Sequence, residues 1–274
     1  MPCVTTRDGT DLYVKDWGSG RPVILIHGWP LSADSWDAQA MALADAGYRA
    51  IAYDRRGFGR SAQPWAGYDY DTFSDDLADV MAATGATRDA TLVGFSMGGG
   101  EVARYMSRHD GKGVIAAGLI ASVVPYMRHA EDNPLGIPQE GLDGMQEAIR
   151  QDRPAFFREV FQSFFGVDAH PNLVSDDVLN WAWLMAMQAG LKPTIACTTA
   201  FVQTDFRDDL PAFHVPTLLV HGTGDLQVPI DISARKAAPA IAHSNLIEYE
   251  GAPHGLTVTH RERFTADLLA FLAG

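Results

Sequence analysis

A serine in a glycine-rich turn is the residue of this sequence best suited to covalent chemistry. The run Gly94-Phe95-Ser96-Met97-Gly98 matches the pattern G-x-S-x-G. The pattern alone also occurs in ordinary glycine-rich turns, but here it follows an apolar run at 90–93 and precedes a helix-like stretch at 101–107. In a strand–turn–helix context the serine lies on a sharp turn beside free helix N–H groups, which stabilise negative charge. We therefore predict that Ser96 is a nucleophile.

A serine nucleophile needs a base within hydrogen-bond reach and a third group that orients the base. In this type of turn the partners follow along the chain in the order serine, acid, histidine. His254 lies in a loop between the last predicted strand and the last helix, and Asp225 follows the apolar run 217–220. Loops at the carboxyl edge of a parallel sheet carry catalytic groups. We therefore predict His254 as the base and Asp225 as the orienting acid.

The other histidines and carboxylates occupy less suitable segments. His27 and His221 each end a strand before a glycine, and we interpret them as structural residues near the site. The remaining histidines are assigned to surface or helix-flanking segments: His109, His129, His170, His214, His243 and His260. The rival carboxylates do not lie in the first loop after a strand and are interpreted as solvated charges: Asp205, Asp208, Asp209 and Asp231.

Acyl chemistry also needs two N–H donors directed at the oxygen on which negative charge develops. The residue after the nucleophile, Met97, supplies one donor. The best candidate for the second is the backbone amide of Trp29, in the loop after the first core strand. Pro30 restricts Trp29 to extended conformations and could hold this amide in place. The alternative is that Trp29 packs in the core and Pro30 only ends a loop.

The sequence gives no signal for a metal or a nucleotide cofactor. No group of histidines and cysteines has the spacing of a zinc site. The run 54–61 contains a G-x-G, but it lacks the third glycine of a dinucleotide loop and the Gly-Lys-Ser/Thr of a P-loop. We interpret its arginines as braces for the turn after the strand at 49–53. We expect neither a metal nor a cofactor.

Short apolar runs that alternate with helix-like stretches must position these residues. The runs lie at 23–27, 49–53, 90–94, 113–121, 217–221 and 245–249, and most are apolar throughout. Such runs are typical of strands buried on both faces of a parallel sheet. Helical spacing appears at 35–46, 72–84 and 261–272, and Asp8-Gly9 predicts a hairpin turn near the start. The pattern predicts an α/β fold with a mostly parallel central sheet flanked by helices.

One long segment breaks the alternation. From about 126 to 212 no clear strand appears; a loop rich in proline and glycine at 133–138 precedes helical stretches at 155–165, 176–188 and 193–204. We predict a helical cap at 126–212 inserted between two parts of an α/β core, 1–125 and 213–274.

Composition narrows the class of protein further. The 274 residues carry a formal net charge of −13, which argues against nucleic acid and anionic membranes as partners. Apolar residues make up 47% of the chain, as in a globular protein with a sizeable core. The start of the chain lacks a signal-peptide core, and no run is long enough to span a bilayer. Cys3 and Cys197 are interpreted as separate reduced thiols, so we expect a soluble, cytoplasmic protein.

A set of stretches carries a family resemblance over nearly the whole chain, weakest in the cap. They lie at 15–20, 27–31, 54–61, 93–100, 204–207 and 252–255. With them the chain resembles the α/β-hydrolase superfamily and, within it, the bacterial cofactor-free haloperoxidases, also called perhydrolases, and the aryl esterases. The segments 132–134 and 136–140 are also similar to a γ-lactamase branch of this group.

The resemblance implies an α/β-hydrolase fold with the roles given above for the serine, histidine, aspartate and two amides. Family members hydrolyse small esters, and many make peracids from carboxylic acids and hydrogen peroxide without metal or haem. The peracid can then oxidise bromide or chloride. A proline after the oxyanion tryptophan, as at Pro30, is typical of members with good perhydrolase activity. Epoxide hydrolases and haloalkane dehalogenases use an aspartate nucleophile, so Ser96 argues against both.

We therefore expect a carboxylic-ester hydrolase whose acyl-enzyme is cleared by water or hydrogen peroxide. A small apolar pocket is predicted between the serine turn and the cap, lined by Trp29, Pro30, Phe95, Val123, Met127, Phe201 and Gln227, each of which could equally belong to the core. A lactamase or amidase acting on a small cyclic amide is the main alternative, and a lyase or a ligand sensor on the same fold is another. The expected partner is a small ester or lactam, and family relatives often associate, which leaves a homo-oligomer open.

Overall fold

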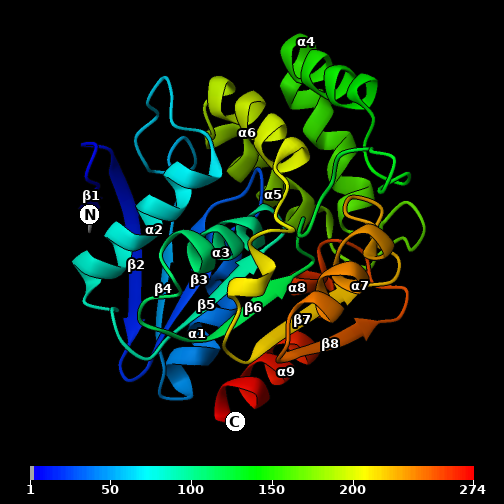
Figure 1. The fold of residues 1–274 in the computed structure, drawn as a ribbon. Coiled ribbons are helices and arrows are strands. Elements are labelled where there is room, and N and C mark those ends of the chain that lie inside the picture. The colour runs from blue at the N-terminus through cyan, green and yellow to red at the C-terminus, as the bar shows by residue number, and fades with distance from the viewer. Residues whose placement is uncertain (1–2) are drawn as a thin grey trace.

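The computed structural model describes residues 3–274 and contains an eight-stranded sheet with helices on both faces (Figure 1). The strands are β1 (Cys3–Thr5), β2 (Asp11–Gly18), β3 (Pro22–Ile26), β4 (Arg49–Tyr53), β5 (Ala90–Phe95), β6 (Val114–Ile120), β7 (Thr217–Gly222) and β8 (Ser244–Tyr249). Their order is β1-β2-β4-β3-β5-β6-β7-β8. All pairs from β4 to β8 are parallel, so the predicted fold class is confirmed. Met1 and Pro2, with which the expected signal-free start begins, lie outside the described residues.

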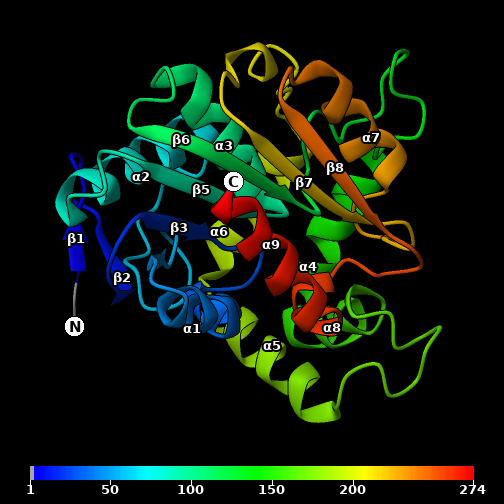
Figure 2. The same cartoon turned by 90° about the horizontal axis from the view of Figure 1, so that it is seen from below.

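Four helices cover the two faces of the sheet. Helices α1 (Asp37–Asp45) and α9 (Arg261–Ala273) lie on one face, and α2 (Tyr70–Thr84) and α3 (Met97–Arg108) lie on the other (Figure 2). Short elements complete the fold: α7 (Ala234–Ala237), α8 (Leu256–Thr259) and single 3-10 turns at Ala33–Trp36, Leu210–Ala212, Ile230–Ile232 and Ala238–Ala240. Helix α3 begins at Met97, directly after the predicted nucleophile and four residues earlier than the sequence pattern suggests.

The alternation of side chains along β3 explains why this strand is apolar throughout. Val23 and Leu25 belong to the core cluster that includes residues of α1 and α9. Ile24 and Ile26 belong to the opposite cluster, which includes residues of α2 and α3. Because successive side chains of a strand point to opposite faces, a central strand between two helical layers needs apolar residues at every position. The sheet core therefore consists of two apolar layers.

The chain begins with the predicted hairpin. Strands β1 and β2 pair in antiparallel fashion, and β2 also pairs antiparallel with β4. Gly9 in the turn has a φ of 86°, a conformation that glycine adopts without steric cost. Thr6 closes the loop by accepting a hydrogen bond from Gly9 N at 2.9 Å.

Three helices are inserted between β6 and β7 and lie together beyond the carboxyl ends of the central strands (Figure 1). They are α4 (Gln139–Phe164), α5 (Asp176–Gln188) and α6 (Leu191–Gln203). This is the segment for which a helical cap is predicted; its boundaries at 126 and 212 stay a prediction. The helical stretch expected at 155–165 is only the second half of α4, which kinks at Asp152 two residues before Pro154. The missing backbone N–H of proline and its clash with the preceding turn account for the kink.

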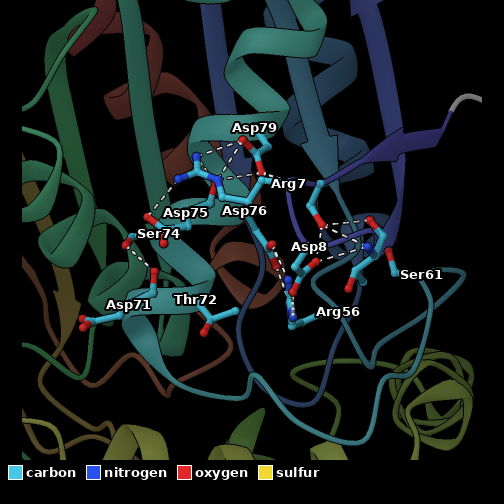
Figure 3. A network of polar contacts seen from close by, with 12 residues as sticks. Arg7, Asp8, Arg56, Ser61, Asp71, Thr72, Ser74, Asp75, Asp76 and Asp79 are labelled. Atoms are coloured by element: carbon cyan, nitrogen blue, oxygen red, sulfur yellow. Dashed lines mark hydrogen bonds and ion pairs between the residues drawn. The ribbon is translucent and has the colours of Figure 1, made fainter.

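A network of ion pairs fastens the hairpin to α2 (Figure 3). The buried guanidinium of Arg56 donates to both carboxylate oxygens of Asp76 at 2.6 Å and to Asp8 at 2.8 Å. Asp76 lies on α2 and is also buried. Arg7 pairs with Asp79 on the same helix, but its side chain is 52% exposed. Arg56, in the turn after β4, therefore acts in a buried ion pair, whereas Arg7 acts in a solvent-exposed one.

This difference predicts unequal contributions to stability. We expect Arg56→Met to lower the free energy of unfolding by about 3–5 kcal/mol, because the substitution leaves the Asp76 carboxylate buried without its partner. The matched variant Arg7→Met should cost about 0–1 kcal/mol, as for other solvent-exposed ion pairs. Equilibrium unfolding in urea measures both values. Equal losses in the two variants would contradict the burial argument.

Candidate active site

Ser96 occupies a strained turn between β5 and α3. Its φ of 55° and ψ of −118° lie outside the regions that side-chain-bearing residues favour. The turn is possible because the chain passes very close to itself. A Cβ at Gly94 would lie 2.3 Å from the carbonyl oxygen of Gly98, and a Cβ at Gly98 would lie 2.4 Å from that of Ile26. The two glycines of the G-x-S-x-G pattern are therefore required by space, and they hold Ser96 at the end of a central strand.

The structure brings the predicted histidine and aspartate to this serine. His254 Nε2 lies 2.9 Å from Ser96 Oγ, and His254 Nδ1 lies 2.6 Å from Asp225 Oδ2. Asp225 follows β7 and His254 follows β8, so both residues reach the same edge of the sheet as Ser96. A proton on Nδ1, donated to the carboxylate, leaves Nε2 free to accept the proton of the serine.

The carboxylate of Asp225 is buried and surrounded by donors. Its Oδ1 accepts hydrogen bonds from the backbone N–H groups of Gln227 at 2.9 Å and Val228 at 2.8 Å. Burial alone would raise the pKa of Asp225, but the charge of His254 and hydrogen bonds from His221 and His254 outweigh it, and the pKa is lowered. The acid is thus held in its ionised form.

His221 contributes to this arrangement more closely than the sequence suggests. Its Nε2 lies 2.8 Å from the Val228 carbonyl oxygen and 3.3 Å from Asp225 Oδ2. The side chain is fully buried at the end of β7. Its position four residues before Asp225 in one strand–loop segment is the signal that could have indicated the contact.

Two aromatic rings hold the imidazole of His254 in place. The ring of Phe95 lies 5.1 Å away, centroid to centroid, and the ring of Phe164 from α4 lies 4.9 Å away, edge to face. The prediction that Phe95 lines the substrate pocket is wrong. It is the last residue of β5 and belongs, with Val93 of the same strand, to the core cluster on the α1 and α9 face of the sheet. Phe95 therefore packs beneath the histidine, against Trp36 and Phe164.

The segments that carry the two predicted oxyanion donors also meet at Ser96. Met97 is the first residue of α3, so its N–H has no acceptor within the helix. The loop of Trp29 is pressed against the serine, because a Cβ at Gly28 would lie 2.9 Å from Ser96 Cβ. The Trp29 indole donates to the Thr194 carbonyl oxygen of α6 at 3.0 Å. Helix α6 therefore holds the side chain of the residue whose amide is the second candidate donor.

A small cavity of about 60 Å³ opens onto Ser96 and His254. The inserted helices and the loops of the sheet both form its wall, because α4 and α6 contribute side chains alongside the loops after β3, β6 and β7. The wall consists of Trp29, Pro30, Ser96, Val123, Met127, Ile137, Met145, Val160, Phe164, Phe201, Gln227, Val228 and His254. None of these lining residues, all within the described range, is an aspartate, glutamate, lysine or arginine. The cavity is therefore suited to a small uncharged group.

Most of the predicted lining residues lie on this wall: Trp29, Pro30, Val123, Met127, Phe201 and Gln227. The sequence analysis missed Ile137, Met145, Val160, Phe164 and Val228. Met145 lies in the unpredicted first half of α4. The others lie in the cap or next to Gln227, and nothing in their residue types distinguishes cavity lining from core.

Three of the four rival carboxylates lie in pairs with arginines. Asp205 pairs with Arg207, and Asp231 pairs with Arg235. The prediction that these aspartates are solvated is wrong for Asp209, which is buried and accepts hydrogen bonds from Arg104 at 3.2 and 3.3 Å. None of these three pairings joins the cluster around Ser96.

Residues 3–274 contain neither a cluster of metal-ligating side chains nor a helix able to span a membrane. No group of three or more histidine, cysteine, aspartate and glutamate side chains is arranged to hold a metal ion in that part of the chain. No helix there has the length and apolar character that a membrane span requires.

The family of the chain follows from its sequence as a whole. The family model described as the alpha/beta hydrolase fold matches residues 21–260. That span includes Ser96, its partners His254 and Asp225, and the inserted helices. The chain belongs to the α/β-hydrolase family.

Named relatives show which members of this family the chain resembles. A non-heme chloroperoxidase of Kitasatospora aureofaciens is 44% identical over 274 residues, which cover 99% of each chain. A bifunctional esterase/perhydrolase of Acinetobacter calcoaceticus is 44% identical over 276 residues, again with 99% of each covered. The crystal structure of a bromoperoxidase from Bacillus anthracis matches with a TM-score of 0.96 at 42% identity, covering 100% of this chain and 99% of that chain. The resemblance to haloperoxidases and perhydrolases is confirmed.

The geometry of Asp225 predicts the effect of removing its charge. Asp225→Asn presents an amide to His254 Nδ1, which favours the wrong imidazole tautomer, and in a comparable serine triad this change lowers kcat by about 10⁴-fold. We expect a loss of about 10³- to 10⁴-fold in kcat for a small ester, measured by steady-state kinetics. A loss below tenfold would remove Asp225 from the triad.

The lowered pKa of Asp225 also predicts a pH dependence of stability. An ordinary aspartate has a pKa of about 3.9 in the unfolded chain, so ionised Asp225 stabilises the fold above that pH and loses this effect as pH falls towards the folded-state pKa. The Tm difference between wild type and Asp225→Asn should stay constant from pH 7 to about pH 5 and shrink below about pH 4. A difference that shrinks between pH 7 and about pH 5 would contradict the lowered pKa.

Proposed function

We propose that the protein is a serine carboxylic-ester hydrolase that acts on small esters through an acyl-enzyme and forms peracids when hydrogen peroxide replaces water. One observation carries the proposal: Ser96, in a positive-φ turn, lies 2.9 Å from a histidine that is itself 2.6 Å from a buried carboxylate. This chain of contacts, open to an apolar cavity, matches what acyl transfer by a serine needs.

In the first half of the reaction Ser96 Oγ attacks the ester carbonyl carbon while His254 Nε2 takes the serine proton. The carbonyl oxygen becomes an oxyanion, for which the Trp29 and Met97 N–H groups are the proposed donors. The tetrahedral intermediate collapses, the bond to the leaving alcohol breaks, and the alcohol takes the proton from His254. The serine is left acylated.

In the second half His254 removes a proton from water or hydrogen peroxide, whose oxygen attacks the acyl carbon. Collapse of the second intermediate returns the proton to Ser96 and releases a carboxylic acid or a peracid. The peroxide branch is supported by the esterase/perhydrolase and chloroperoxidase names of the relatives at 44% identity. The peracid, once released, can oxidise bromide or chloride outside the site.

The size and chemistry of the cavity support small acyl groups. One water molecule needs roughly 10–15 Å³ of such space, so about 60 Å³ holds only a few non-hydrogen atoms. The lining is apolar except for Ser96, His254 and Gln227, and the amide of Gln227 donates to Ser163 Oγ at 2.8 Å. Esters of acetate and similar short acids fit this space.

The location of the protein, its division into core and cap, and its self-association are also proposals. We propose a cytoplasmic location, because Cys3 and Cys197 are free thiols and a reducing compartment keeps thiols unpaired. Burial raises the pKa of Cys197 to about 12, which makes it a poor nucleophile. We likewise propose that the chain divides into a core and a cap at 126 and 212 and that it self-associates.

The first test removes the nucleophile. We expect Ser96→Ala to abolish hydrolysis of p-nitrophenyl acetate while Tm changes little, because the hydroxyl is small and only its catalytic contacts are lost. The matched variant Ser74→Ala removes a buried hydroxyl from α2, outside the cavity lining, and should retain activity. A serine-directed phosphonate should give one adduct on Ser96 by mass spectrometry of the intact protein and its peptides. Substantial activity in Ser96→Ala would overturn the proposal.

The second test addresses the choice between water and peroxide. Pro30 lines the cavity beside Trp29, so we expect Pro30→Leu to change the space in which the second nucleophile approaches the acyl-enzyme. The ratio of peracid to acid formed from the same ester should change, whereas Tm should change little. Val123→Leu, elsewhere on the wall, is the control for a change in cavity volume alone. An unchanged ratio in Pro30→Leu would remove Pro30 from the mechanism.

A further inference from the structure

A buried ion pair joins the two segments that carry the proposed oxyanion donors and takes no part in the reaction described above. Arg55 Nε donates to Glu101 Oε2 at 2.8 Å, and the side chains are 1% and 0% exposed. Tyr53 OH donates to the other oxygen of Glu101. A fully buried charged pair in a core of apolar residues needs an explanation.

Arg55 also contacts the strand that leads into the Trp29 loop. Its Nη2 donates to the His27 carbonyl oxygen at 2.9 Å, and its backbone N–H donates to His27 Nε2 at 2.9 Å. His27 Nδ1 then carries the ring proton and donates to the Gly28 carbonyl oxygen at 2.8 Å. Arg55 therefore fixes His27, and His27 fixes the peptide that precedes Trp29.

The partner of Arg55 belongs to the other donor segment. Glu101 is the fifth residue of α3, the helix that begins at Met97. One guanidinium thus joins the loop after β3 to the first turns of α3. Because an arginine side chain presents several N–H groups in a rigid plane, it can set the spacing between two such segments.

Stability is a weak reason for keeping this pair. Burial disfavours both charges, since it raises the pKa of Glu101 and lowers the pKa of Arg55. Buried ion pairs can often be replaced by apolar residues of similar volume without loss of stability. Their better-supported use is to specify one arrangement of the groups around them.

We propose that Arg55 and Glu101 are positioning residues of the oxyanion hole: through His27 and α3 they hold the Trp29 and Met97 amides at the separation that the tetrahedral oxyanion requires. The proposal rests on the proposed function, in which these two amides are the donors. A displacement of about 1 Å in such a group can cost about 10²-fold in rate, so the effect appears in kcat before it appears in substrate binding.

Arg56, the next residue, provides a matched control. It is equally buried and also forms a carboxylate pair, but its partners are Asp76 on α2 and Asp8 in the hairpin (Figure 3). Replacing either arginine by lysine removes the same fork of donors from the core. Only the replacement at 55 changes a contact to the segments that carry the oxyanion donors.

The experiment compares Arg55→Lys with Arg56→Lys in the full chain. Lysine places one compact ammonium where arginine bridged two partners. For Arg55→Lys we expect kcat for p-nitrophenyl acetate to fall by about 10- to 100-fold with KM within about twofold. Inhibition by phenylboronic acid, which forms a tetrahedral adduct with the serine, should weaken by the same factor. Arg56→Lys should lower Tm but leave all three constants within about twofold.

A second variant keeps the test decisive if Arg55→Lys does not fold. Glu101→Gln keeps the size of the side chain and an oxygen for Arg55, removes the charge, and should lower kcat and boronate affinity together. If either folded variant loses Tm but keeps kcat and boronate affinity, as Arg56→Lys is expected to, the pair is structural and the inference is overturned. Wild-type protein without turnover that depends on Ser96 would instead overturn the proposed function, and the inference with it.

Discussion

The backbone of Ser96 is the constraint on which the rest of the site depends. A residue with a side chain held at a φ of 55° costs of order 1–3 kcal/mol, and it persists only where its surroundings leave no other conformation. Here those surroundings are β5 in the middle of the sheet, α3 starting at the next residue, and two glycines that let the chains approach within contact distance. With the serine fixed at a strand end, parallel neighbours deliver their own loops to the same edge. Trp29 after β3, Asp225 after β7 and His254 after β8 arrive together for this reason.

Core and cap then divide the work of the site. The sheet and its loops supply the charged and polar groups of the site. These are the Asp225 carboxylate, which four donors keep ionised, the His254 imidazole that it orients, and the buried Arg55–Glu101 pair that joins the two donor segments. The inserted helices supply part of the apolar wall. They also contact the catalytic groups, since α4 packs Phe164 on His254 and α6 accepts the indole hydrogen bond of Trp29. A change in the cap can therefore alter catalysis as well as the size of the acyl group accepted.

The sequence predicted those features that follow from local rules. Apolar runs that end at glycine, histidine or aspartate indicated the strands and the edge at which they meet, and the G-x-S-x-G turn indicated the elbow. The failures have equally local causes. The first half of α4 contains Gly141 and Gly144 and begins after a proline-rich loop. Because glycine has a low helix propensity, the sequence pattern did not indicate a helix there. Phe95 adjoins Ser96 in the sequence, but it packs in the core beneath the imidazole of His254 and is absent from the cavity wall. The contact of Arg55 with Glu101 joins segments 46 residues apart in the sequence and depends on three-dimensional packing, which no spacing rule encodes.

In the proposed reaction, hydrolysis and peracid formation share one acetylated Ser96. The direct test is to measure the ratio of peracetic acid to acetic acid at one fixed peroxide concentration for several acetates with different leaving groups, such as methyl, phenyl and p-nitrophenyl acetate. The leaving group has already departed from a shared acyl-enzyme, so we expect the same ratio for every acetate while the overall rates differ. A ratio that changes with the leaving group would mean that peroxide attacks the ester itself and that no common acyl-enzyme is formed.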